Sequence, residues 1–205
     1  MANNKEFVID FEKAVETAFF QRKTEVVAKE LLGKVLIRRH QGIWLAGKIV
    51  ETEAYLPIGD LSCHAAIGKT KRNAPMFDDG GILYVYKIYG VHHCINFVSE
   101  TEGIGCAVLI RAVEPLLGID KMMRLRNTDK IHNLCKGPGN LAKAFGFTKV
   151  DNFSSLHLPE LFIQGFDSKE KIEIARTKRI GIKKSANMLL RFIQKESEFV
   201  SAVKI

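Results

Sequence analysis

The sequence predicts an α+β fold with a mostly antiparallel sheet. Short apolar runs follow one another along the chain, turn signals separate several of them, and no regular helical crossovers intervene. Parallel neighbours would need such crossovers, whereas antiparallel neighbours can be joined by a short turn. With 205 residues, 46% of them hydrophobic and 26% charged, the chain can bury one core. We therefore expect one domain over residues 1–205, in which residues 1–20 are a poorly defined N-terminal segment.

The first third of the chain predicts a helix, a strand pair and a loop. Residues 24–32 read as a helix that Thr24 caps and the following glycine ends. Two strands, at 34–40 and 43–53, flank a turn at Gln41-Gly42. The segment 57–81 is long, polar and rich in glycine, which is typical of a functional loop.

The middle of the chain predicts a hairpin, a strand and a helix. Residues 83–88 and 93–98 form the hairpin strands, with residues 89–92 at the tip. An apolar strand follows at 106–113. Pro115 then opens a helix that runs to Leu125, because proline suits a first helical turn.

The last third predicts one small helix and several short strands. The helix follows the break at Gly137-Pro138-Gly139 and ends at Gly146. Four apolar runs are expected to be strands that close the fold, at residues 161–163, 172–174, 190–193 and 199–203.

The charge of the chain points to a polyanionic partner. The net charge is +8, and residues 169–205 hold 10 Lys/Arg against 4 Glu, so this segment supplies 10 − 4 = +6. Lysine and arginine contacts to phosphates release counterions, so such an asymmetry fits nucleic acid. The alternative is a basic surface without a specific partner.

Membrane and metal functions find little support. No apolar run approaches the roughly 20 residues that span a bilayer, and the N-terminus lacks the layout of a signal peptide. The four cysteines form no C-x-x-C pair, which disfavours a zinc site and is typical of reduced thiols. We expect an intracellular protein without membrane contact, metal or cofactor.

Two glutamates two residues apart are the first candidates for chemistry. Side chains at Glu51 and Glu53 share a face of their strand, with Tyr55 next along it. A carboxylate beside aromatic rings is partly desolvated and can act as a base near neutral pH. The alternative is that both glutamates are solvated or ion-paired.

Aromatic residues gather in the same part of the sequence. Tyr84 and Tyr86 share a face of the hairpin, and Tyr89 sits at its tip beside a glycine, where a large ring is expected to be exposed. An exposed ring on a projecting hairpin suits insertion between base pairs. Tyr86 and Tyr55 could then stack an extruded base. The alternative for the strand tyrosines is a place in the core.

Isolated polar residues complete the candidate site. His64 lies in the loop after Tyr55, and Asn96 interrupts an apolar strand, where a buried amide must satisfy the backbone or contact a ligand. Arg111 is a lone charge in another apolar strand, so it should pair with Glu51 or Glu53.

Phosphate contacts are expected from two further segments. Lys136 and Gly137 precede a predicted helix whose first N–H groups could face a phosphate. Arg176 and Arg179 belong to the basic C-terminal segment and are expected to contact the nucleic-acid backbone. Both segments could also be solvent-facing turns.

Four strings together resemble the alkyladenine (3-methyladenine) DNA glycosylase family of base-excision repair. They are Gly47-Lys-Ile-Val-Glu-Thr-Glu-Ala-Tyr55, Leu83-Tyr-Val-Tyr-Lys-Ile-Tyr-Gly90, Val108-Leu-Ile-Arg-Ala-Val-Glu-Pro115 and Leu134-Cys-Lys-Gly-Pro138. The match runs in order from about Val26 to Val200. One departure is Val91-His92-His93, where some relatives carry an aromatic or aliphatic pair.

The resemblance implies a single domain with a curved, mostly antiparallel sheet, flanking helices and a projecting β-hairpin. It implies a monomer that flips an alkylated or deaminated purine from double-stranded DNA and hydrolyses its N-glycosidic bond. No candidate for a Schiff-base lysine stands out in the sequence, so we expect this activity without strand cleavage. The protein would be cytoplasmic in a bacterium and nuclear in a eukaryote. The roles implied are Glu53 as the base that activates water, Arg111 as its positioner, Tyr55, His64, Tyr86 and Asn96 as the base pocket, and Tyr89 as the intercalating residue.

This chemistry suits the residue types. Breaking the bond gives the sugar oxocarbenium character, which a carboxylate stabilises while it deprotonates water. Two alternatives stay open. One is a lesion- or nucleic-acid-binding module without catalysis, and the other is a metal-dependent nuclease that uses Glu51, Glu53, Asp60 and His64.

Overall fold

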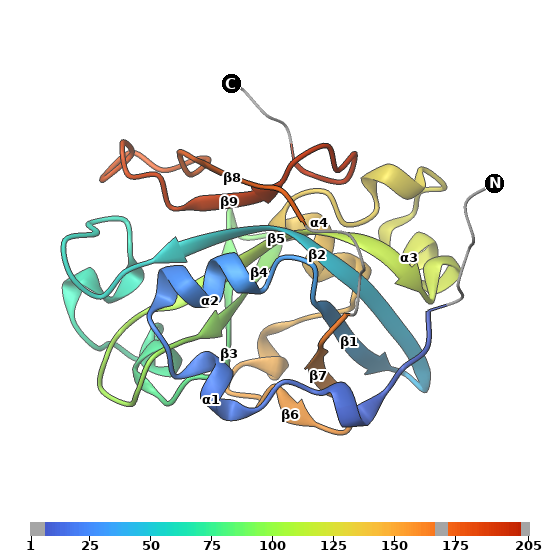
Figure 1. The fold of residues 1–205 in the computed structure, drawn as a ribbon, viewed down its shortest axis with the longest axis horizontal. Helices are drawn as coiled ribbons and strands as arrows, with labels where there is room; N and C mark the ends of the chain where they lie inside the picture. The colour runs from blue at the N-terminus through green and yellow to red at the C-terminus, as the bar shows by residue number, and fades with distance from the viewer. Residues whose placement is uncertain (1–6, 167–171, 202–205) are drawn as a thin grey trace.

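The computed structural model describes residues 7–166 and 172–201, and their strands form one curved sheet. The strand order is β3-β4-β5-β2-β1-β7-β6, and β9 pairs with both β2 and β8. The pairings recorded for these residues are all antiparallel. Helices α1 and α2 lie in front of the sheet in Figure 1, α4 lies behind β2, and α3 lies at the right of the view. The predicted α+β class is confirmed.

The strands are mostly those that the sequence predicts. Their bounds are β1 (Val35–His40), β2 (Ile43–Tyr55), β3 (Leu83–Ile88), β4 (His92–Val98), β5 (Ala107–Leu117), β6 (His157–Leu158), β7 (Leu161–Gln164), β8 (Ile174–Thr177) and β9 (Arg191–Gln194).

The helices are short. The α-helices are α1 (Thr17–Phe20), α2 (Thr24–Glu30), α3 (Ile119–Arg126) and α4 (Pro138–Ala144), and the 3-10 turns are η1 (Phe11–Lys13), η2 (His64–Ile67), η3 (Ala74–Phe77), η4 (Ile131–Asn133) and η5 (Lys149–Asp151). The loop predicted at 57–81 contains η2 and η3 and no strand of the sheet.

Strand β2 is the element that positions the two glutamates. Its first half pairs with β1, its second half with β9, and nearly all of it with β5. Between Ile49 and Thr52 its register with β5 shifts twice, which marks a β-bulge. Past the bulge, Ala54 faces the main core, while Glu51 and Glu53 face the arginines of β5 and β9.

Helix α2 is present where the sequence predicts it, but its cap differs. Lys23 is the residue before the helix and makes no side-chain cap. The Thr24 backbone N–H and hydroxyl both donate to the Glu100 carboxylate, at 3.1 and 2.6 Å. The Glu100 carboxylate, distant in sequence, therefore accepts the hydrogen bonds at the start of the helix, whereas the sequence predicted that Thr24 itself caps it.

The helix predicted from Pro115 is wrong over its first residues. Strand β5 continues through Leu117, and Pro115 lies opposite Gly47 at another register shift of β2, a bulge where a missing N–H is tolerated. Helix α3 begins only after Gly118, which has φ 75° and whose added Cβ would lie 2.4 Å from the Trp44 carbonyl oxygen. Glycine is thus required at this junction.

Two C-terminal strand predictions are also corrected. Ile172 is not in a strand, and β8 begins at Ile174. Residues 199–201 form a turn and a bend instead of a strand, and the rest of the predicted run at 199–203 lies outside the described residues. The Ser201 backbone N–H donates to a glutamate side chain, so that N–H is not used in a sheet.

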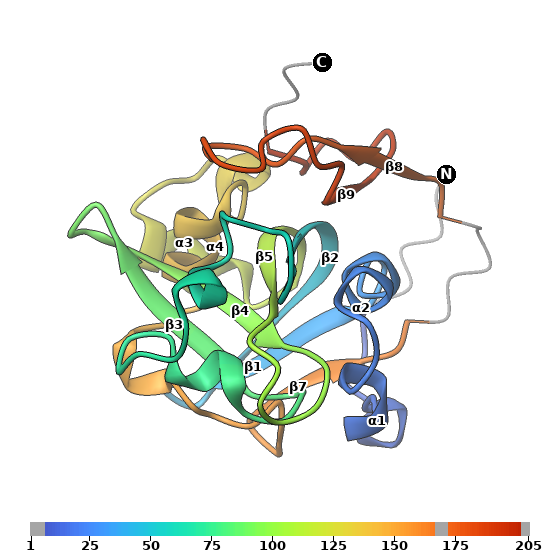
Figure 2. The ribbon, with the colours of Figure 1, turned by 90° about the vertical axis from the view of Figure 1, so that its left-hand side faces the viewer.

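The predicted hairpin is formed by β3 and β4, and its tip projects from the body of the molecule (Figure 2). Tyr89 and Gly90, at the tip, both have positive φ, 51° and 69°. Helix α4 packs closely against β4. A Cβ atom added to Gly139 of α4 would lie only 3.1 Å from His92 of β4. In the part of the chain that the structure describes, no helix has the length and hydropathy needed to cross a bilayer.

Candidate active site

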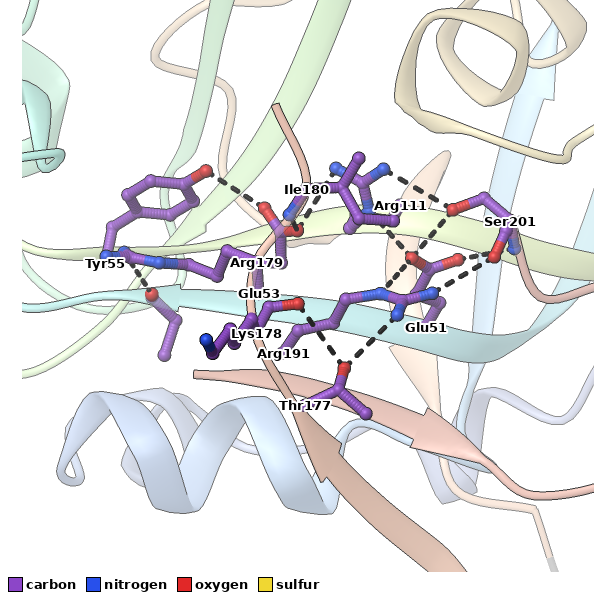
Figure 3. A network of polar contacts seen from close by, with 11 residues as sticks. Glu51, Glu53, Tyr55, Arg111, Thr177, Lys178, Arg179, Ile180, Arg191 and Ser201 are labelled. Atoms are coloured by element: carbon purple, nitrogen blue, oxygen red, sulfur yellow. Dashed lines mark hydrogen bonds and ion pairs between the residues drawn. The ribbon is translucent and has the colours of Figure 1, made fainter. Parts of the chain in front are cut away.

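Glu51 and Glu53 are both fully buried, and Arg111 from β5 lies between them (Figure 3). The Arg111 Nε donates to Glu51 Oε1 at 2.7 Å, and its Nη1 lies 3.2 Å from Glu53 Oε1. The sequence predicted a pair between Arg111 and one of the two glutamates, and the arginine pairs with both. Buried charges of this kind need such partners.

Glu51 is held from several sides. Arg191 Nε of β9 donates to it at 2.7 Å, and the Ser201 backbone N–H and hydroxyl donate at 2.7 Å each. Burial by itself would raise the pKa of the Glu51 carboxyl, but the charges of Arg111 and Arg191 and the Ser201 hydroxyl hold that pKa below its usual value. Glu51 is therefore a firmly ionised anchor.

Glu53 has fewer partners and the opposite shift. Ile180 N–H donates to its Oε1 at 2.8 Å, and the Tyr55 hydroxyl donates to its Oε2 at 2.9 Å. Burial raises the pKa of the Glu53 carboxyl above its usual value, and the charge of Glu51 adds to the rise against the opposing effect of Arg111 and these donors. A carboxylate with a raised pKa is a suitable proton acceptor near neutral pH.

A cavity of about 250 Å³ lies beside this network. Glu53 does not line it, but its two side-chain partners Tyr55 and Arg111 do, so the carboxylate stands directly behind the cavity wall. The lining residues are Tyr55, His64, Arg72, Met76, Tyr84, Tyr86, Ile88, Cys94, Asn96, Leu109, Arg111, Pro138, Gly181 and Ile182.

Aromatic rings form one side of the cavity. The His64 and Tyr86 rings lie 4.6 Å apart between centroids, and Tyr84 and Tyr86 lie 5.4 Å apart. His64 Nδ1 is 2.9 Å from the Tyr84 hydroxyl, and burial together with the Arg72 charge lowers the His64 pKa. His64 is thus neutral near pH 7, with its other ring nitrogen free of this bond.

Asn96 is buried at the same cavity. Its Nδ2 donates to the Tyr84 backbone carbonyl at 3.1 Å, which fixes the orientation of the amide. The amide satisfies the backbone, which is one of the two alternatives raised by the sequence, and it also lines the cavity. The four predicted base-pocket residues Tyr55, His64, Tyr86 and Asn96 are thus brought together with Arg111, the predicted positioning residue.

The other predicted residues lie outside the cavity. Tyr89 is 82% exposed at the hairpin tip. Lys136 Nζ donates to the Glu198 carbonyl oxygen at 3.0 Å, and Gly137 directly precedes α4. Arg176 is about half exposed and pairs with Glu25 at 2.8 Å.

Arg179 does not occupy the place that the sequence predicts. Its side chain is fully buried and makes two hydrogen bonds to Asp60, at 2.5 and 2.6 Å. A buried guanidinium that is committed to a carboxylate cannot reach a DNA phosphate. The prediction that Arg179 contacts the backbone is therefore wrong.

Sequence reasoning missed Arg191, Ser201, Arg72 and the Ile180 N–H. Arg191 carries the same signal as Arg111, a lone charge in an apolar run, and could have been found by the same rule. Ser201 and the Ile180 amide carry no sequence signal, because backbone donors are set by the fold.

The four residues of the metal alternative are committed to other partners. Glu51 and Glu53 pair with arginines, Asp60 with Arg179, and His64 with Tyr84. Among the described residues, no three His, Cys, Asp or Glu side chains are placed to hold a metal ion together.

The chain is similar to a known family over most of its length. The family model described as methylpurine-DNA glycosylase matches residues 18–198. Proteins with the printed name "Putative 3-methyladenine DNA glycosylase" are similar to it. The one from Methanoculleus marisnigri is 46% identical over 90% of this chain and 96% of that protein. Those from Chlorobium phaeobacteroides and Clostridium perfringens are 44% and 42% identical, over 91% and 89% of this chain and 94% and 96% of their own lengths.

Proposed function

The chain belongs to the methylpurine-DNA glycosylase family, and from this premise we propose that it excises alkylated or deaminated purines from double-stranded DNA. The substrates would be 3-methyladenine, 7-methylguanine, hypoxanthine and ethenoadenine. The observation that carries the proposal is a fully buried carboxylate, Glu53, held by an arginine directly behind an aromatic-lined cavity.

The cavity would receive the flipped base. A flat purine would stack between Tyr55 on one side and His64 and Tyr86 on the other, and each such contact stabilises a bound base by about 1–3 kcal/mol. Asn96 would contact the base edge with the amide that Tyr84 orients. A damaged base that pairs poorly costs less to flip, which favours lesions over normal purines.

Glu53 would act as the general base. Water adds to C1′ of the sugar, its proton passes to Glu53, and the bond from C1′ to the purine nitrogen breaks. The negative carboxylate also stabilises the oxocarbenium character of the sugar. Among the described residues, Oε1 lies 3.2 Å from Arg111 Nη1 and accepts from the Ile180 N–H, whereas Oε2 accepts from the Tyr55 hydroxyl alone, so Oε2 has room for a water proton.

Arg111 would position Glu53 and set its charge. Because Glu51 fixes the Nε of Arg111 and Ser201 lies 3.4 Å from its Nη2, the guanidinium cannot rotate away from Glu53. Arg111 thereby keeps the pKa of Glu53 lower than burial alone would. We expect the rate of base release to fall as pH drops through the raised pKa of Glu53, because only the ionised carboxylate can accept the proton.

The remaining predicted residues would hold the DNA. Tyr89, exposed at the projecting tip, would fill the gap that the flipped base leaves. Lys136, the Gly137 N–H and Arg176 would contact phosphates. We further propose that the whole chain acts as one domain and as a monomer, in the cytoplasm of a prokaryotic cell like those of its relatives.

The test is single-turnover base release from a duplex that carries one ethenoadenine or hypoxanthine, with EDTA present. We expect the wild type to release the base and the strand to break only after hot alkali, because none of the cavity-lining residues described is a lysine that could form a Schiff base. Glu53→Gln should lower the rate by at least about 1000-fold, since it removes the proton acceptor.

The same assay separates the alternatives. A lesion-binding module would bind the duplex tightly and release none of these bases or 3-methyladenine. A metal-dependent nuclease would cut undamaged DNA, and EDTA would stop it. Strand breaks without alkali would contradict monofunctional hydrolysis.

A further inference from the structure

We propose that Arg179 and Asp60 form a positioning pair that holds the two uncharged hydrogen-bond donors of Glu53, the Tyr55 hydroxyl and the Ile180 N–H. The inference rests on the proposed function of Glu53 as the base. Neither residue of the pair lines the cavity, so each would act through its neighbours and not on the substrate.

The first line of evidence is the way Arg179 is fixed. Its Nη1 donates to the Ala54 carbonyl oxygen at 2.9 Å as well as to Asp60, and its Nη2 donates to the other Asp60 oxygen. Asp60 in turn accepts from the Leu56 and Ser62 backbone N–H groups, at 3.1 Å each. The pair is therefore a rigid, two-point contact on the backbone that directly follows Tyr55.

The second line is that one residue touches both donors. The Arg179 guanidinium lies 4.6 Å from the centre of the Tyr55 ring, a cation–π contact, so it restrains the ring whose hydroxyl donates to Glu53. The next residue in the chain is Ile180, whose N–H is the other donor. Figure 3 shows Arg179, Tyr55 and Ile180 together around Glu53. A displacement of Arg179 would therefore shift both donors away from the carboxylate.

The third line is that the pair joins two loops at the cavity. Leu61 N–H donates to Ser185 Oγ at 3.0 Å, and Ser62 Oγ donates to the Lys184 carbonyl oxygen at 2.5 Å. The loop after β2 and the loop after β8 are thus tied together on the outside, with the buried Asp60–Arg179 pair beneath. Gly181 and Ile182 of the second loop line the cavity.

The consequence concerns the protonation of Glu53. Hydrogen bonds to a carboxylate favour its ionised form, so losing the Tyr55 and Ile180 donors raises its pKa. Other charged or titratable groups near Glu53 do not belong to the pair and stay in place in the variants below. These are Arg111 of β5, Glu51 of β2, Arg191 of β9, Tyr86 of β3 and Cys94 of β4.

Asp60→Asn distinguishes positioning from simple charge effects. If Asp60 acted only through its negative charge, its removal would lower the pKa of Glu53. If it positions Arg179, Asp60→Asn keeps the arginine charge but loosens its hold, and the pKa of Glu53 rises by about one pH unit. The two accounts predict opposite signs.

The experiment is a pH titration of the Glu53 carboxyl carbon by ¹³C NMR in the free protein, assigned by the signal that Glu53→Gln removes. It is paired with single-turnover base release across the same pH range. We expect Asp60→Asn to move the titration and the acid side of the rate profile to higher pH. Arg179→Lys, which keeps the charge but cannot make the two-point contact, should move both in the same direction.

The matched control is the Arg38–Asp151 pair. It is also largely buried, with a 2.8 Å ion pair, and Arg38 lies 4.1 Å from the centre of the Phe147 ring. Asp151→Asn should leave the pKa of Glu53 and the shape of the rate profile unchanged. The NMR titration follows the signal of the folded protein, so a loss of folded protein lowers its intensity and does not move its midpoint.

The outcomes are separable. The positioning pair is overturned if Asp60→Asn leaves the pKa of Glu53 unchanged or lowers it, and Arg179→Lys decides by the same criterion if Asp60→Asn does not fold. A wild type that releases no base overturns the proposed function instead, and the NMR titration still decides the pair.

Discussion

Two glutamates separated by one residue on the same strand face have opposite electrostatic environments. Glu51 accepts from two arginines and twice from Ser201, which lowers its pKa, whereas Glu53 shares one arginine and its pKa is raised. When the environments of two carboxyls shift their pKa values in opposite directions, the group with the lowered pKa can hold the site together and the other can exchange protons.

The opposite shifts predict opposite effects on stability. Glu53→Gln should raise the Tm at pH 7.5 by about 1–3 °C, because the folded state disfavours the ionised form of Glu53. The amide oxygen can keep the contact with Arg111 and the hydrogen bond from the Ile180 N–H, and the amide nitrogen can donate to the Tyr55 hydroxyl. Glu51→Gln should lower the free energy of unfolding by about 3 kcal/mol, because it leaves two buried arginines without a full countercharge.

Thermal unfolding of both variants between pH 4 and pH 8 checks this prediction. The rise in Tm caused by Glu53→Gln should shrink as pH falls, because protonation of Glu53 in the wild type removes the buried negative charge that the variant does not carry. The cost of Glu51→Gln should shrink only below the usual glutamate range, where the lowered pKa of Glu51 lies. A stabilised Glu51→Gln would contradict the assignment.

At the scale of elements, the β3–β4 hairpin carries the residues of two proposed roles on one piece of backbone. Its strands contribute Tyr84, Tyr86 and Asn96 to the cavity, and its tip presents Tyr89 to solvent. The tip has positive φ at Tyr89 and Gly90, which makes the turn tight, and the Tyr89 side chain is exposed. The hairpin thus fixes the distance between the cavity and Tyr89, the residue proposed to fill the gap in the duplex.

Tyr89→Ala tests this division. We expect the rate of base release from duplex DNA to fall about tenfold, since the flipped state loses stacking of about 1–3 kcal/mol. Release from the same lesion in single-stranded DNA should change little, because no gap has to be filled. An equal loss on both substrates would place Tyr89 in the chemistry and contradict a wedge. The Tm should stay within about 1 °C, as the ring is exposed.

Strand β5 shows where local rules mislead. Proline is common in the first turn of helices, and the two leucines after Pro115 fit a helical pattern. The chain nevertheless stays in the sheet to Leu117. The bulge opposite Gly47 accepts the proline, and the turn at Gly118 delays the helix. Pairing with a partner strand outweighs the local preference.

At the scale of the whole molecule, the net charge of +8 predicts salt-sensitive DNA binding. If about four phosphates are contacted, the affinity for undamaged duplex should fall about 100-fold between 50 and 200 mM salt. Arg176→Gln should make the slope of log K against log salt shallower by about 0.9, whereas Arg179→Lys should leave it unchanged, because Arg179 is buried. Fluorescence anisotropy over this salt range measures both slopes. A shallower slope for Arg179→Lys would contradict its buried placement.

The sequence by itself determined the fold class, the main strands and five of the residues that line the cavity. Alternating apolar runs encode strands locally, and lone polar residues within them, such as Asn96 and Arg111, mark positions where burial demands a partner. Only the tertiary structure decided which partners these are. The place of Arg179 against Asp60, the Ser201 and Ile180 donors, and the opposite pKa shifts of Glu51 and Glu53 depend on segments more than 100 residues apart in sequence. Such long-range contacts form only when distant segments of the chain fold together, so no local pattern records them.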